Sequence, residues 1–145
     1  MPENLNRFFS DLADAFSTSN FDECARFLKY PGAFYAGENV MLFRDRENMS
    51  QFFRQIHQKV SDRGVHKIES RVVAQSFRSG QRFPVWVEWI HFNKTGEELG
   101  KSFHRFFVER NSTGHYRILM FEAIEYAHPD LADELPWEKL LESIE

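Results

Sequence analysis

Apolar residues recur along the chain with two different periods, which predict two kinds of secondary structure. In the first part of the chain they return every three or four residues, as on one face of an amphipathic helix. Asn20 followed by Glu23 matches a capping box, Asp45 is a suitable N-cap, and Pro31 favours a helix end before it. The pattern predicts three helices, over residues 5–16, 20–30 and 45–62.

A different period begins near residue 65, where four strand-like segments follow one another as far as residue 127. The turns between these segments are short, so consecutive segments should pair as antiparallel neighbours. An extended stretch at residues 33–44 adds a hairpin before the third helix. The predicted fold class is therefore α+β, with N-terminal helices packed on a curved, mainly antiparallel sheet.

The register of this sheet follows from its turns. A two-residue turn at Ser79-Gly80 sets Arg71 opposite Glu88, and such a cross-strand charge pair contributes up to about 1 kcal/mol. The next turn, at residues 94–97, continues the alignment. The remaining predicted pairs are Ile68 with His91, Ser70 with Trp89, Val72 with Val87, Ala74 with Val85, Trp89 with Ser102, Val87 with His104, and Val85 with Phe106.

The last strand, residues 115–127, has two possible registers, because the loop before it has four or five residues. A five-residue loop at 110–114 sets His104 opposite Met120 and Ser102 opposite Glu122, whereas a four-residue loop turns the whole strand over. We prefer five residues, because that register places Met120 on the concave face, together with the apolar residues an even number of positions away from it.

The two faces of the predicted sheet differ in character. The concave face is mainly apolar and consists of Val85, Val87, Trp89, His91, Ser102, His104, Phe106 and Val108. The outer face mixes charges with large apolar side chains, namely Trp86, Ile90, Phe92, Phe103, Phe107 and Phe121. Such a surface is too apolar to leave in water, so we expect a homodimer through the outer sheet face. The alternative cover is a helix of the C-terminal tail.

The end of the chain differs from the rest in charge. The 145 residues fit one domain and carry a formal net charge of -4. Residues 130–145 hold six acidic side chains against Lys139 alone, so the acidity belongs to the tail. We expect one domain at residues 1–127 and an acidic tail at 128–145, with a short docking helix that starts at Pro136.

Composition also bears on the partners and the compartment. The 16 Phe, 3 Trp and 4 Tyr are spread along the chain, which favours a bulky core or an aromatic cavity over a nucleic-acid surface. Cys24 is the only cysteine, so no intrachain disulfide can form. No segment approaches the roughly 18 apolar residues of a membrane span, and no basic head precedes an apolar run at the N-terminus. We expect a cytoplasmic protein with no nucleic-acid or membrane partner.

Five segments together resemble the nuclear transport factor 2-like superfamily, which includes ketosteroid isomerases, scytalone dehydratases and small polyketide-cyclase-like proteins. They are FFSDLADAF, FDECARFL, YPGAFYAG, VMLFRDRENMSQFF and HYRILMFEAIEY. The likeness covers about residues 5–126. It implies a cone-shaped fold with a ligand cavity between sheet and helices, often dimerised through the outer sheet face. Enzymes of this superfamily work without a cofactor, so none is expected.

The concave face contains the candidate site. The preferred register places His104 and Glu122 diagonally on adjacent strands, about 7 to 8 Å apart at their backbones, where an imidazole and a carboxylate form a plausible acid/base pair. The non-catalytic alternative is that His104 is a buried structural histidine and Glu122 lies at the rim of the cavity. A pair of aspartates like that of ketosteroid isomerases is not found. We expect the ligand to contact Trp89, Ser102, His91, Phe106, Met120 and Tyr35.

Two function hypotheses remain open from the sequence. One is a cofactor-independent isomerase, dehydratase or cyclase-like enzyme that acts on a small, largely apolar or aromatic molecule through His104 and Glu122. The other is a non-catalytic module that binds such a ligand or dimerises. No metal is expected, because His91 and His104 lie about 14 Å apart in this register, too far for bonds of about 2 Å to one ion.

Overall fold

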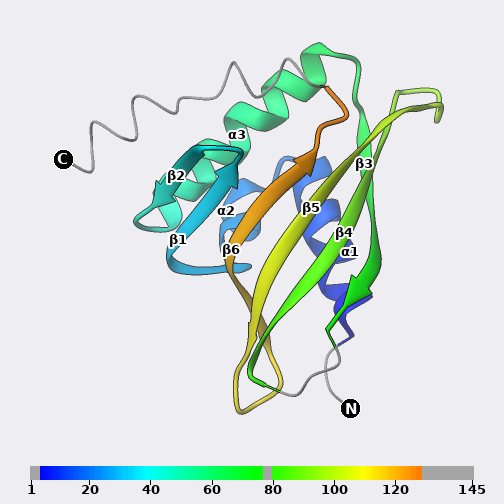
Figure 1. The fold of residues 1–145 in the computed structure, drawn as a ribbon. Helices are drawn as coiled ribbons and strands as arrows, with labels where there is room; N and C mark the ends of the chain where they lie inside the picture. The colour runs from blue at the N-terminus through cyan, green and yellow to red at the C-terminus, as the bar shows by residue number, and fades with distance from the viewer. Residues whose placement is uncertain (1–3, 77–79, 129–145) are drawn as a thin grey trace.

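The computed structural model describes residues 4–76 and 80–128 and confirms the α+β class and the cone-shaped fold. Three helices, α1 (Leu5–Ser17), α2 (Phe21–Ala25) and α3 (Arg46–Asp62), pack against one open sheet (Figure 1). The strands are β1 (Leu28–Ala36), β2 (Asn39–Phe43), β3 (Lys67–Gln75), β4 (Arg82–Phe92), β5 (Glu98–Arg110) and β6 (Tyr116–Glu125). The docking helix predicted in the tail lies outside the described residues, as does part of the predicted Ser79-Gly80 turn.

The two long helices form where the apolar spacing predicts them, and side chains cap both. Asn4 accepts a hydrogen bond from the backbone N–H of Asn6 at 2.8 Å, and Asp45 accepts one from Asn48 at 2.9 Å. The apolar face of α1 is buried against the sheet. The capping box predicted at Asn20 does not form, because the Asn20 side chain makes no cap hydrogen bond.

The second helix is shorter than predicted, because its last residues join the sheet instead. It ends at Ala25, and β1 begins at Leu28, which pairs with Ile118 in β6. The periodicity of the predicted second helix cannot reveal a parallel partner ninety residues away in the chain. Here the pairing with β6 takes precedence over the helical spacing. The sheet order is β2-β1-β6-β5-β4-β3, with β1 and β6 parallel and every other neighbouring pair antiparallel.

The register of β3, β4 and β5 matches the prediction over nearly its whole length. Arg71 lies opposite Glu88, with Nε and Oε1 3.5 Å apart. The pairs of Trp89 with Ser102, Val87 with His104 and Val85 with Phe106 are all present. One predicted pair is wrong: a bulge after Val72 sets Ala74 opposite Trp86 rather than Val85. The bulge lies near the strand end and leaves the concave residues in place.

The register of β6 differs from the prediction and turns half of that strand over. The loop has the expected five residues, but it spans 111–115, since Arg110 pairs with Tyr116. Leu119 then forms a bulge, so that Val108 pairs with Ile118 but Phe107 pairs with Met120. Opposite residues share a face, and a one-residue bulge exchanges the faces beyond it.

The predicted placements of four side chains are therefore wrong. Met120 pairs with Phe107 and Glu122 with Arg105, so both point to the outer face, and Phe121 points to the concave face. Tyr35 pairs with Glu122 across the β1–β6 ladder and shares its outer face. Without Phe121, the outer face keeps the half-buried Trp86, Ile90, Phe92, Phe103 and Phe107. The homodimer expected through this face stays a prediction.

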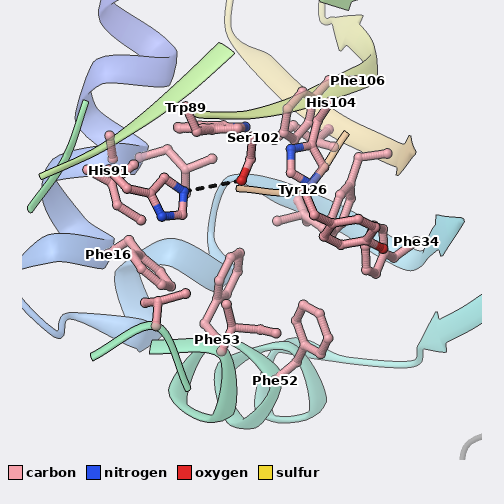
Figure 2. A pocket seen from close by; sticks show the side chains of 18 residues that line it. Phe16, Phe34, Phe52, Phe53, Trp89, His91, Ser102, His104, Phe106 and Tyr126 are labelled. Carbon is pink, nitrogen blue, oxygen red and sulfur yellow. Dashed lines mark hydrogen bonds between the residues drawn. The ribbon is translucent and has the colours of Figure 1, made fainter. Parts of the chain in front are cut away.

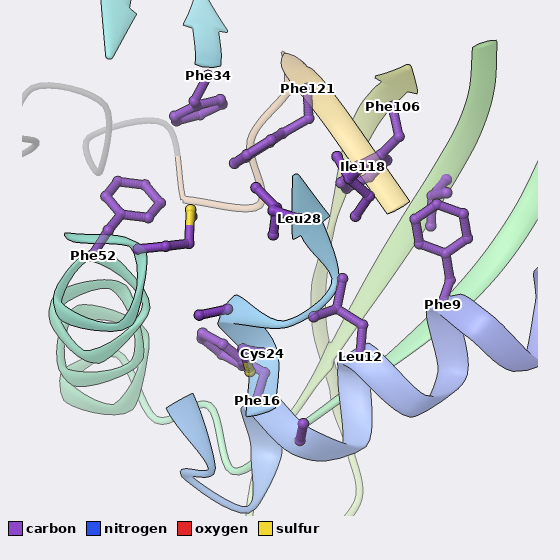
Figure 3. Packing of buried hydrophobic residues seen from close by; sticks show 14 of the residues in the cluster. Phe9, Leu12, Phe16, Cys24, Leu28, Phe34, Phe52, Phe106, Ile118 and Phe121 are labelled. Atoms are coloured by element: carbon purple, nitrogen blue, oxygen red, sulfur yellow. The ribbon is translucent and has the colours of Figure 1, made fainter. Parts of the chain in front are cut away.

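The main core lies between the helices and the concave face. Figure 3 shows Phe9, Leu12 and Phe16 of α1 facing side chains of the sheet, among them Phe106 and Ile118. Cys24 is completely buried here, and burial raises the pKa of its thiol to about 12, so it acts as a small core group. Within the described residues, no helix is long and apolar enough to cross a membrane.

Candidate ligand-binding cavity

A cavity of about 140 Å³ lies between the helices and the concave face of the sheet (Figure 2). Helix α1 contributes Leu12, Ala13 and Phe16, and α3 contributes a second group of apolar side chains, Phe52, Phe53, Ile56 and Val60. The sheet supplies the remaining wall. The surface of the cavity is almost entirely apolar, so the site can exclude water from whatever it encloses.

Five of the eight residues proposed from the sequence line this cavity: Trp89, His91, Ser102, His104 and Phe106. All five lie on β4 and β5, where the predicted register is correct. The other three, Glu122, Met120 and Tyr35, are not among the lining residues, because they lie on the outer face.

Glu122 is paired with a cation outside the cavity. Its carboxylate lies 3.4 Å from the guanidinium of Arg105, directly across the β5–β6 ladder, and about two fifths of each side chain is exposed. The predicted acid/base contact between His104 and Glu122 is therefore not formed. The physical cause is the bulge at Leu119, which the hydrophobic pattern of β6 does not predict.

Among the sheet residues that line the cavity, sequence reasoning missed five, and four of these lie on β1 and β6. Phe34 and Phe121 stack with ring centroids 4.6 Å apart, and Phe121 stacks on Phe106 at 5.5 Å. Phe34 lies opposite Phe121 in the parallel ladder. Tyr126 follows β6 and also lines the cavity. Recognising the parallel partner β1 would have placed Phe34 and Phe121 on one face.

The polar side chains that line the cavity include Ser102, which Figure 2 shows between His91 and His104. Ser102 Oγ lies 3.2 Å from His91 Nε2 and accepts a hydrogen bond from the backbone N–H of Ala127 at 3.1 Å. Three buried atoms of the lining residues have no hydrogen-bond partner within the described part of the chain: His91 Nδ1, His104 Nδ1 and the Tyr126 hydroxyl. Each such atom is costly to leave unpaired.

These polar groups are neutral near pH 7. Burial lowers the pKa of both His91 and His104 to about 4, and a neighbouring imidazole adds to this effect, His128 for His91 and His91 for His104. Although the His104 residue is only half-buried, its Nδ1 atom is covered, so we regard it as desolvated. Burial also raises the pKa of Tyr126 to about 12.

The arrangement offers no obvious metal centre. The rings of His91 and His128 are 5.3 Å apart between centroids, and His104 lines the same cavity. Although these imidazoles are near one another, residues 4–76 and 80–128 contain no group of three or more His, Cys, Asp or Glu side chains that could hold a metal ion.

With this fold and cavity, the chain belongs to the family described as NTF2-like protein (DUF6841), whose model matches residues 3–125. No curated protein sequence matches the chain.

Solved structures repeat the same fold at low sequence identity. A domain of unknown function with a cystatin-like fold from Nostoc punctiforme has a TM-score of 0.66 and 17% identity, over 97% of this chain and 90% of that one. Aln2 from a Streptomyces species has 0.62 and 15%, over 88% and 90%. ActVI-ORFA from Streptomyces coelicolor has 0.60 and 10%, over 82% and 90%. These likenesses show the fold alone.

Proposed function

We propose that the protein binds a small, largely apolar or aromatic molecule, about the size of one substituted ring, in this cavity. The observation that carries the proposal is the space itself, about 140 Å³ with an almost wholly apolar surface. An apolar cavity of about 150 Å³ stays dry and takes up benzene, so free space of this size is sufficient for a single ring.

The aromatic side chains around the cavity favour a flat ligand. Phe34, Phe121 and Phe106 form a stacked series, with interplanar angles of 15° and 14°. Trp89 meets Phe106 edge to face at 5.8 Å. A bound ring would extend these stacked and edge-to-face contacts, each worth about 0.5 to 1.5 kcal/mol beyond the area it buries.

Binding is better supported than catalysis. Of the predicted acid/base pair, only His104 lines the cavity, and among the described residues no carboxylate lines it. A general acid or base works best with a pKa near the working pH, whereas burial lowers the pKa of His104 to about 4. An isomerase, dehydratase or cyclase-like reaction would therefore begin from a weak base with no partner. We favour the non-catalytic alternative.

The proposal is tested by filling the cavity from one side. Ala13 is buried on α1 and lines the cavity, so Ala13→Leu would occupy much of the space. Toluene should bind the unaltered protein in calorimetric titration and raise its melting temperature. Ala13→Leu should weaken that binding at least tenfold.

The matched control is Ser10→Leu, which introduces the same side chain at an exposed position of α1. It should bind toluene as the unaltered protein does. The proposal fails if toluene, indole and cyclohexane all leave the unaltered protein unchanged, or if Ala13→Leu binds toluene as tightly as Ser10→Leu.

A further inference from the structure

The three residues that follow β6 lie over the concave face of the sheet, and we call them the strap. They are Tyr126, Ala127 and His128, drawn in orange beyond the end of β6 in Figure 1. The last paired residue of β6 is Glu125, opposite Phe103. From there the strap crosses β5 and reaches β4, so it runs over two neighbouring strands instead of extending the ladder.

Contacts with β5 and β4 hold the strap against the sheet. The backbone N–H of Ala127 donates to Ser102 Oγ at 3.1 Å, and the ring centroid of His128 lies 5.3 Å from that of His91. Gly100 pairs with His91 and shares its concave face. A Cβ atom placed at Gly100 would lie 3.4 Å from the Cβ of Ala127 and 3.6 Å from its carbonyl oxygen. The strap therefore packs directly on the backbone of β5.

The strap also forms part of the boundary of the cavity. Tyr126 lines the cavity beside Phe34 (Figure 2), and among the described residues it is the one lining residue that belongs to no helix or strand. The residues that the strap contacts on the sheet include His91 and Ser102, which line the cavity as well. All three strap residues are only half-buried, so a single layer of irregular chain separates this part of the cavity from solvent.

Lifting the strap disturbs less of the fold than moving a helix or a strand. Helices α1 and α3 bury side chains such as Phe16 and Phe52 in the main core, and the strands are held by their ladders. The strap lies beyond the ladder of β6, and lifting it breaks the hydrogen bond to Ser102. In return, the Tyr126 hydroxyl, which is buried with no partner within the described residues, gains hydrogen bonds to water. Packing thus keeps the strap in place, and an unpaired polar atom opposes it.

We propose that the strap is the gate of the cavity: a small apolar ligand enters and leaves when residues 126–128 lift off β5, and the strap then returns over it. This inference rests on the proposed function, since it specifies how the same cavity takes up its ligand. A gate changes the height of the barrier and not the free energies of the free and bound states. It therefore changes the association and dissociation rates by the same factor.

The test locks the strap to β5 with a disulfide. Gly100→Cys together with Ala127→Cys places two Cβ atoms 3.4 Å apart, close to the range of about 3.5 to 4.5 Å that disulfides span. Neither residue lines the cavity. The native Cys24 is completely buried, and burial raises the pKa of its thiol to about 12, so it does not compete for the pairing.

Fluorobenzene is the probe, and fluorine NMR exchange spectroscopy measures its association and dissociation rates. In the oxidised double variant both rates should fall at least tenfold, while the dissociation constant changes less than twofold. The reduced form is the matched control, because it contains the same two substitutions, and reduction should restore both rates. Equal rates in the two forms would overturn the inference, since the ligand would then pass elsewhere. Failure of the two cysteines to pair under oxidising conditions would contradict the position of the strap on β5.

A second variant loosens the strap instead. Ser102→Ala removes the hydroxyl that accepts the backbone N–H of Ala127, and both rates should rise at least threefold. The matched control is Ser70→Ala, opposite Trp89 on the same face of the sheet, which does not line the cavity and should leave both rates unchanged. Equal rates in these two variants would contradict the anchoring of the strap by Ser102.

The outcomes separate this inference from the function on which it rests. Binding of fluorobenzene with equal rates in the oxidised and reduced forms would leave the proposed function standing and remove the gate. Failure of both fluorobenzene and toluene to bind the unaltered protein would remove both.

Discussion

Two hairpins share strand β5, and they differ in regularity. Strand β4 pairs with β5 without interruption from Arg82–Glu109 to His91–Gly100. Strand β6 pairs with the other edge of β5 through two register shifts, one at Leu119 and one at Ile124. The difference lies in the other neighbour: β4 also borders the antiparallel β3, whereas β6 must also match the parallel β1. In this sheet, the strand with two unlike partners is the one that contains the bulges.

The consequence for the cavity is direct. Side chains from the regular hairpin reach the cavity in strict alternation, as His91, Ser102 and His104 do. Beyond Leu119 the alternation of β6 is reversed, which brings Phe121 inward and sends Glu122 outward. The irregular hairpin thus decides whether the cavity wall is aromatic or acidic.

The largest expected effect tests this reversal with neighbouring residues. Phe121→Ala removes a buried ring that stacks on Phe34 and Phe106, and should lower the free energy of unfolding by about 3 kcal/mol. Glu122→Ala removes only an exposed ion pair and should cost less than about 1 kcal/mol. Urea denaturation measures both. Equal costs, or a larger cost for Glu122→Ala, would contradict the bulge.

An intermediate effect is expected on the pH dependence of stability, because the regular hairpin contains both cavity histidines. Burial lowers their folded-state pKa from 6.5 to about 4, so between these pH values the unfolded chain binds more protons. Stability should therefore fall as the pH drops from 6.5 toward 4, by on the order of 2 kcal/mol for each histidine at pH 5 relative to pH 7. Urea titrations at several pH values measure this loss.

Matched variants attribute the loss to these histidines. His104→Phe should flatten the pH dependence between 6.5 and 4, whereas His115→Gln, at an exposed position before β6, should leave it unchanged. An unaltered slope in His104→Phe would show that the ring is solvated in the folded protein.

The smallest expected effects concern two ion pairs on the outer face of the sheet, one on each side of β5. Arg71 pairs with Glu88 across β3 and β4, and Arg105 pairs with Glu122 across β5 and β6. Double-mutant cycles should give coupling energies of about 0.2 to 1 kcal/mol for each pair and none for the mismatched Arg71 and Glu122. Coupling in the mismatched pair alone would mean that one of the registers is wrong.

Local signals were sufficient to predict α1, α3 and most of the register of β3, β4 and β5. Helical spacing, the Asp45 cap and the alignment of Arg71 with Glu88 all concern residues that are close in the chain or joined by a short turn. The same signals placed five cavity residues correctly, because those residues depend only on that register. The family resemblance gave the cone and the cavity, and the family match confirms the resemblance.

Long-range pairing explains what could not be predicted. Leu28 joins the sheet by pairing with Ile118, and Glu122 leaves the cavity because β6 bulges at Leu119 in its pairing with β5. Neither feature is visible in the spacing of nearby residues. The unpaired state of His91 Nδ1 and the Tyr126 hydroxyl likewise depends on three-dimensional packing that a sequence pattern does not specify.

The central place of β6 has a consequence for how the molecule folds. The sheet order puts this strand, the last one described, between β1 and β5. Until β6 is in place, β2 and β1 form one hairpin and β5, β4 and β3 another unit, with no ladder between them. Joining them requires contacts across most of the chain length, which slows folding because long loops must close first. On the ribosome, the two units would therefore have to wait for residues 116–125 before a single sheet, and the cavity beneath it, could form.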